Sequence, residues 1–99
     1  MPDVLIIEDN EHVRRTLEMA FVREGYTVST ANDGQQALHD LAASESPPKI
    51  IIMDLIMPVM DGWKLRKCLL EKPLWASVPV IAFSGAGVED AETTNVPLA

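Results

Sequence analysis

Four short apolar runs, separated by stretches with helical spacing, constrain the fold of this chain more than any other feature. The runs are Val4–Ile7, 26–31, Ile50–Met53 and 78–83. Each is too short for a helix and rich in β-branched residues, so each is predicted to be a strand, and the most apolar are predicted to be buried on both faces.

The stretches between these runs predict helices. The first is expected to begin after Asn10, an N-cap residue, and to end at Gly25, a left-handed cap. The second follows the turn at 32–34, and the third is ended by Pro73. The expected inner faces are Val13, Leu17, Ala20 and Phe21, then Ala37, Leu38, Leu41 and Ala42, then Leu65, Cys68 and Leu69. Strands that alternate with helices predict an α/β fold, a doubly wound parallel sheet covered on both faces.

Length and charge exclude several classes of protein. A chain of 99 residues is expected to form one domain, and its longest apolar runs are too short to cross a membrane. One cysteine, Cys68, excludes an internal disulfide and favours a reducing, cytoplasmic location. A net charge of −7 argues against direct nucleic-acid binding by this segment.

Polar residues follow three of the predicted strands directly. Glu8 and Asp9 follow the first, Asp54 the third and Ser84 the fourth. Because the carboxyl ends of parallel strands share one edge of a sheet, three carboxylates and a hydroxyl are expected to meet there. An acidic residue after a buried strand is often only a helix cap or a solvated loop residue, but the whole set in this order favours a site. Repulsion among carboxylates calls for a held proton or a hard cation such as Mg²⁺.

Three segments make a resemblance to a known family specific. They are VLIIEDN at 4–10, IIIMDLIMPVMDG at 50–62 and VPVIAFSG at 78–85. With them the chain resembles a response-regulator receiver domain of bacterial two-component signalling, from its first residue to about residue 85. The resemblance implies a flavodoxin-like (CheY-like) three-layer sandwich.

The resemblance also implies roles for the acidic residues. Asp54 matches the phosphoacceptor, which takes a phosphoryl group from the phosphohistidine of a partner. Asp9 and Asp54 match direct Mg²⁺ ligands, and Glu8 matches a residue that acts mainly through water. The backbone carbonyl of Ile56 matches a further ligand.

Other matched positions surround the phosphoryl group. Ser84 stands where the family keeps a switch hydroxyl that moves to the phosphoryl oxygens. Three residues match positions that shape the phosphoryl pocket: Pro58, Gly62 and Gly85.

The sequence departs from the family pattern at its C-terminal end. The family has a fifth strand with a Lys, and then a fifth helix, whereas Lys49, Lys64, Lys67 and Lys72 all precede Ser84. We therefore expect one receiver domain over residues 1–99, four of five strand–helix units, with the fifth strand and helix missing. A truncated chain and a naturally degenerate receiver both remain open.

The resemblance implies a Mg²⁺-dependent phosphoacceptor switch and not an enzyme. Such a switch catalyses only its own phosphorylation and dephosphorylation. Its expected partners are a sensor histidine kinase or phosphotransfer protein and an unknown output; a homodimer is compatible with it. The alternative is a degenerate receiver that acts as an interaction module without phosphorylation. A phosphohydrolase is disfavoured because Ile56 stands where such enzymes usually have a second acid.

Overall fold

The sheet is parallel and four-stranded, with the order β2-β1-β3-β4. The computed structural model describes residues 1–54 and 62–83. The strands are β1 (Val4–Ile7), β2 (Val28–Ala31), β3 (Ile50–Asp54) and β4 (Val80–Phe83). The predicted strands are confirmed, although β2 and β4 begin later than the predicted starts at 26 and 78.

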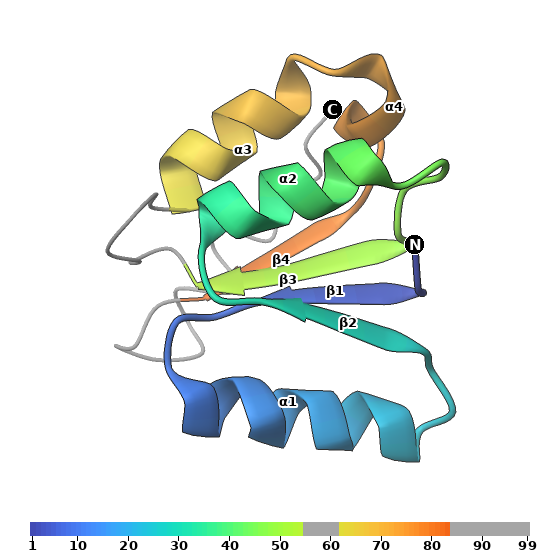
Figure 1. Ribbon diagram of the computed structural model, residues 1–99, viewed down its shortest axis with the longest axis vertical. Helices are drawn as coiled ribbons and strands as arrows, with labels where there is room; N and C mark the ends of the chain where they lie inside the picture. Colours follow the sequence, from blue (N-terminus) through green and yellow to red (C-terminus); the bar gives the residue numbers. More distant parts are fainter. Residues whose placement is uncertain (55–61, 84–99) are drawn as a thin grey trace.

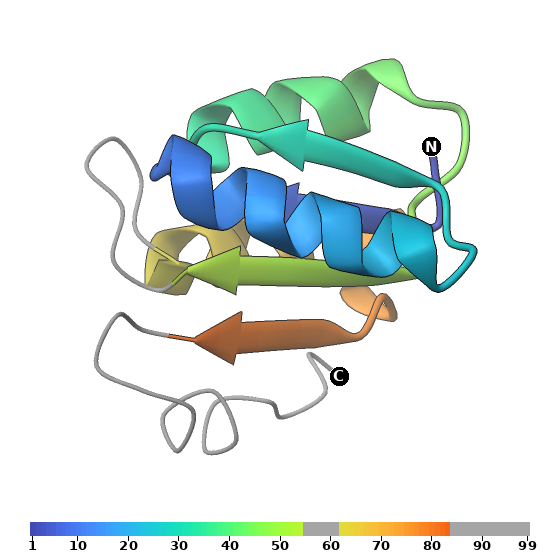
Figure 2. The same ribbon diagram turned by 90° about the horizontal axis from the view of Figure 1, so that it is seen from below.

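Helices cover both faces of this sheet (Figure 1). They are α1 (Glu11–Arg23), α2 (Gly34–Ala43), α3 (Gly62–Leu70) and α4 (Pro73–Ala76). In Figure 1, α1 lies below the sheet, while α2, α3 and α4 lie above it. Figure 2 shows α1 lying over one face of the sheet, whose strand arrows point the same way. The predicted doubly wound α/β architecture is therefore confirmed. No helix in the described ranges combines the length and the apolar character that crossing a membrane requires.

The caps of α1 form as the sequence predicts. The side chain of Asn10 accepts a hydrogen bond from the backbone N–H of Val13 at 3.0 Å. This bond satisfies one of the free N–H groups at the helix start. At the other end, Gly25 has a φ of +95°, a conformation in which any side chain would be strained.

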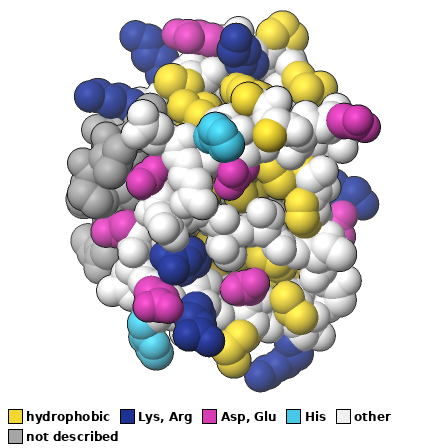
Figure 3. All heavy atoms as spheres, in the orientation of Figure 1, with side chains coloured by type: hydrophobic (Ala, Val, Ile, Leu, Met, Phe, Trp, Pro, Cys, Tyr) yellow, Lys and Arg dark blue, Asp and Glu magenta, His cyan; other side chains and the backbone are white. Residues whose placement is uncertain are grey.

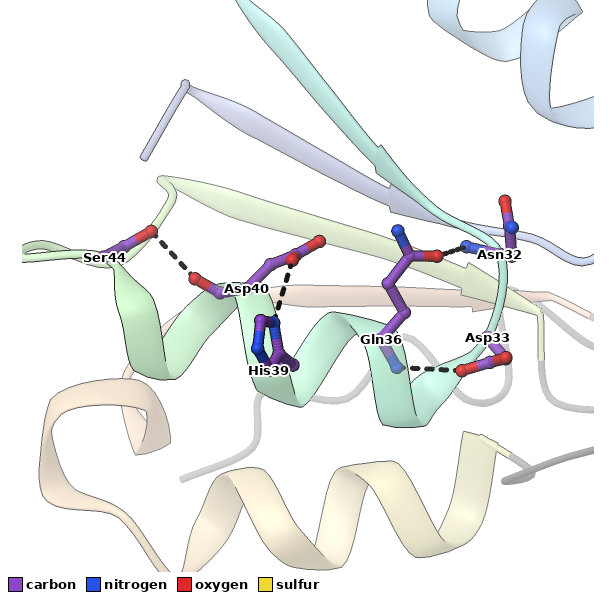
Figure 4. Close-up of polar contacts among 6 residues, drawn as sticks. All are labelled: Asn32, Asp33, Gln36, His39, Asp40 and Ser44. Atoms are coloured by element: carbon purple, nitrogen blue, oxygen red, sulfur yellow. Dashed lines mark hydrogen bonds and ion pairs between the residues drawn. The ribbon is translucent and has the colours of Figure 1, made fainter.

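Two side chains accept backbone hydrogen bonds at the start of α2 (Figure 4). Oδ1 of Asp33 accepts a hydrogen bond from the backbone N–H of Gln36 at 2.8 Å, and the Gln36 side chain accepts one from the N–H of Asn32 at 2.8 Å. At its end, the Ser44 hydroxyl donates to the Asp40 carbonyl at 2.9 Å. The predicted turn at 32–34 is thus the start of a helix.

Alternate residues of each strand bury into opposite faces of the sheet. Leu5 and Ile7 of β1 belong to the cluster under α2 and α3, together with Leu65 and Leu69, whereas Ile6 belongs to the cluster on the α1 side. All of these side chains are fully buried. Burial of each contributes about 1.5–3 kcal/mol to folding. The buried faces of α1 and α2 are narrower than predicted, because Ala20 of α1 and Ala42 of α2 are exposed.

One short helix was not predicted from the sequence. α3 ends at Leu70, before Pro73, and Pro73 begins α4 rather than ending α3. Proline is well suited to a first helical turn, because its missing N–H has no partner there in any case. α4 carries Trp75 into the core at 8% exposure, whereas Trp63 of α3 is 56% exposed.

Candidate metal centre

The strand order places the acidic residues at the topological switch point of the sheet. From β1 the chain connects to β2 on one side, and β3 pairs with β1 on the other. Ile7 lies opposite Met53 in the register, so Glu8 and Asp54, the residues that follow, emerge next to each other. In open α/β sheets, ligands bind outside the carboxyl ends of the strands, at such a switch in strand order.

Three carboxylates converge at this edge of the sheet. Glu8, Asp9 and Asp54 each offer an oxygen, and these oxygens lie within 4.8 Å of one another. Glu8 and Asp54 are buried, at 3% and 8% exposure, while Asp9 is exposed. The cluster therefore has two carboxylates shielded from water and one carboxylate that faces it.

Glu8 is anchored to the start of α1. Its Oε2 accepts a hydrogen bond from the backbone N–H of Asn10 at 3.3 Å, and its backbone carbonyl accepts one from Nη1 of Arg14 at 3.1 Å. Sequence reasoning did not single out Arg14. The only signal for it was a cation in the second turn of a helix that begins beside the acidic pair.

The environment of Glu8 favours its protonated form. Burial raises the pKa of Glu8 from 4.5 to about 7, and the hydrogen bond with Asp9 and the charge of Asp54 act in the same direction. The N–H of Asn10 opposes this, because it stabilises the carboxylate. Burial first, and the neighbouring carboxylates second, thus favour a proton on Glu8 when no cation is bound.

The donor set fits a hard divalent cation. All three donors are carboxylate oxygens, and neither sulfur nor imidazole belongs to the cluster of described residues. Mg²⁺ prefers oxygen ligands and keeps several of its waters, which the exposed side of Asp9 can accommodate. A bound cation would also favour loss of the proton from Glu8, because a nearby positive charge stabilises the carboxylate form.

The structure brings together three of the predicted site residues: Glu8, Asp9 and Asp54. Gly62 is the first residue of α3. The others lie outside the described residues, so their predicted roles remain predictions: Ile56, Pro58, Ser84 and Gly85.

Comparisons with known proteins show which family this chain matches. A family model for the response regulator receiver domain matches residues 4–96. The response regulator PleD of Caulobacter vibrioides is 38% identical over 87 residues, which cover 85% of this chain and 19% of PleD. The chain thus spans less than two thirds of that relative.

Solved structures share the fold. The chemotaxis protein CheY4 of Vibrio cholerae superposes with a TM-score of 0.80 at 26% identity, over 94% of this chain and 76% of that one. The response regulator TrrA of Thermotoga maritima, crystallised in complex with Mg²⁺-BeF, has a TM-score of 0.79 at 22% identity, over 100% of this chain and 82% of that one. The strand order and helix layers described above are therefore those of a known fold.

Proposed function

The chain belongs to the response regulator receiver domain family, and from this we propose that it accepts a phosphoryl group on Asp54 in a Mg²⁺-dependent reaction. The observation that carries the proposal is the convergence of Glu8, Asp9 and Asp54 within 4.8 Å at the switch point of a parallel sheet. A carboxylate is a competent nucleophile toward phosphorus. Asp54 is held at the end of β3, where its position is set by two neighbouring strands.

In the proposed reaction, an oxygen of Asp54 attacks the phosphorus of a phosphohistidine on a partner protein. The new P–O bond forms as the P–N bond breaks, and the electron pair of that bond returns to the imidazole of the partner. Burial of Asp54 keeps the acyl phosphate away from bulk water. Mg²⁺, when held by Asp9 and Asp54 with Glu8 acting through water, would supply positive charge to the phosphoryl oxygens.

Five further residues complete the proposal on the strength of the resemblance alone. The Ile56 carbonyl would be a further Mg²⁺ ligand, and the Ser84 hydroxyl would move to the phosphoryl oxygens as the switch. Pro58, Gly62 and Gly85 would shape the pocket. TrrA, which has the same fold, was crystallised with Mg²⁺-BeF, and this supports the choice of Mg²⁺.

We place the chain in a cytoplasmic signalling pathway, with a sensor histidine kinase or a phosphotransfer protein as the phosphoryl donor. Its catalysis is limited to its own phosphorylation and dephosphorylation. The alternative is an interaction module that works without phosphorylation.

A small phosphodonor separates these functions. Acetyl phosphate with Mg²⁺ should add the mass of one phosphoryl group to the wild-type chain and to Asp40→Asn, a matched control outside the cluster. Asp54→Asn should remain unmodified, and so should wild type in EDTA. A wild-type chain that takes up no phosphoryl group and binds no beryllofluoride with Mg²⁺ would support the alternative. Equal modification of Asp54→Asn would reject Asp54 as the acceptor.

A further inference from the structure

The outer face of α3 exposes large apolar side chains in one stripe. Trp63 and Leu70 are 56% and 44% exposed, and Lys67, also exposed, lies between them. The spacing of these three residues, i, i+4 and i+7, puts them on the same side of a helix. The opposite side carries Leu65 and Leu69, which are fully buried in the core. We call Trp63, Lys67 and Leu70 the α3 patch.

The short helix α4 exposes another large apolar side chain. It packs against α3, and its Leu74 is 52% exposed. Figure 3 shows exposed hydrophobic side chains beside Lys and Arg side chains at the top of the molecule, where α3 and α4 lie. Single exposed apolar residues are common on protein surfaces, but a group that includes a tryptophan marks an interaction site more often.

The same segment is basic in an acidic protein. Four of the eight Lys and Arg residues lie within residues 62–72, namely Lys64, Arg66, Lys67 and Lys72. Glu71 is the one acidic residue of this segment, so it carries a charge of +3, while the chain as a whole carries −7. In the described part of the chain, Lys67 and Lys72 take part in none of the ion pairs.

The outer face of α1 differs from this. Met19 and Val22 are as exposed as Trp63, but charges of both signs surround them. Glu11 and Arg15, for example, form an ion pair with each other at 3.8 Å. α3 therefore differs from α1 because its large exposed apolar side chains lie among charges that are mostly of one sign.

We propose that the α3 patch is a docking surface for an acidic protein segment that presents large apolar side chains. Aromatic anchors such as Trp63 contribute much of the binding energy at interfaces. The cations around it would attract opposite charge and exclude basic partners. Extended polyanions, such as nucleic acids and anionic membranes, fit less well, because the rest of the chain has a charge of −10 (−7 less the +3 of this segment) and would repel them.

Two labelled helical peptides test the proposal. Both carry Leu at i, i+3, i+4 and i+7, and the remaining positions are Glu in one and Lys in the other. Fluorescence anisotropy with the 99-residue chain should show binding of the Glu peptide and a Kd at least about tenfold weaker for the Lys peptide. Trp63→Ala with Leu70→Ala should weaken the Glu peptide by about tenfold or more. The control, Met19→Ala with Val22→Ala, should leave its Kd unchanged.

Charge reversal gives a second, independent measurement. Lys67→Glu with Lys72→Glu should weaken the Glu peptide and strengthen the Lys peptide, and urea unfolding should show that this variant remains folded. Equal affinity for the two peptides would overturn the proposal. It would also be overturned if the α1 control variant lost as much affinity for the Glu peptide as Trp63→Ala with Leu70→Ala. Stronger binding to phosphatidylglycerol vesicles or to a thymidine oligonucleotide, lost in the charge-reversed variant, would show a different class of partner and would also overturn it.

Discussion

Replacing Glu8 by Gln should remove a pH-dependent loss of stability from the metal-free protein. The Glu8 carboxyl is buried beside Asp9 and Asp54, and its pKa is raised from 4.5 to about 7. The folded protein therefore holds this proton more tightly than the unfolded chain does. The stabilising contribution is fully present below pH 4.5 and is lost as the pH rises through about 7.

The two pKa values determine the size of this effect. At about 1.4 kcal/mol for each pH unit between them, the free energy of unfolding should fall by about 3 kcal/mol across this window. Gln has nearly the shape of protonated Glu and cannot ionise. Its side-chain oxygen can still accept the hydrogen bond from the backbone N–H of Asn10, but it carries no charge. The variant should therefore lack this part of the pH dependence.

Urea unfolding in EDTA measures the effect. Wild type and Glu8→Gln should be compared at about pH 5 and about pH 8.5, where the variant should gain about 3 kcal/mol relative to wild type at the higher pH. Other titrating groups are common to both proteins and cancel in the difference. Glu18→Gln, a carboxyl on α1 outside the cluster, serves as the control. If the difference between wild type and Glu8→Gln is the same at both pH values, the electrostatic reasoning is refuted.

Mg²⁺ provides a complementary result. At a concentration of about 100 times its Kd, a ligand specific for the folded state stabilises it by about 2.7 kcal/mol. Wild type should show this gain near pH 8.5, where no proton has to be displaced, and a smaller gain at the same Mg²⁺ concentration near pH 5. Glu8→Gln should bind more weakly at the higher pH, because it has lost one charge from the cluster. An equal gain in both proteins would argue against a role for Glu8 in cation binding.

Four further substitutions test the fold. Leu65→Ala should lower the free energy of unfolding by about 2–5 kcal/mol, because this side chain is fully buried between α3 and the sheet, and Leu70→Ala on the exposed side should change it by less than about 0.5; urea melts of the two variants compare them directly. Asn10→Ala removes the cap hydrogen bond to Val13 and should cost about 0.5–2 kcal/mol in thermal unfolding; an unchanged melting temperature would contradict the cap. Gly25→Ala should cost about 1 kcal/mol in the same assay through its positive φ alone, since a Cβ there meets no atom within 4 Å, and a stabilised variant would contradict this explanation.

Local signals in the sequence were sufficient for much of this fold. The strand Val4–Ile7, the cap at Asn10 and the left-handed Gly25 are all where the pattern predicts them. Such features depend on near neighbours in the chain, on hydrophobic periodicity and on the conformations that single residues can adopt. Even the site was predictable in outline, because parallel strands expose their carboxyl ends at one edge.

Helix boundaries and surface exposure depended on tertiary contacts. Pro73 could end one helix or begin another, and only packing of Trp75 into the core distinguishes the two. Trp63 and Trp75 have the same hydrophobicity, yet one is exposed and the other is buried. The sequence does not say which side of a helix its neighbours will cover.

The apolar runs alone indicate which residues end the strands, and therefore which carboxylates are available for a site. How these carboxylates differ from one another depends on the packing of the folded chain. The order β2-β1-β3-β4 places Glu8 next to Asp54, and the path of the chain into α1 leaves Glu8 buried and its neighbour Asp9 in water. The distinct pKa of Glu8 follows from that burial, because desolvation and nearby charge depend on distances in space and not on positions in the chain.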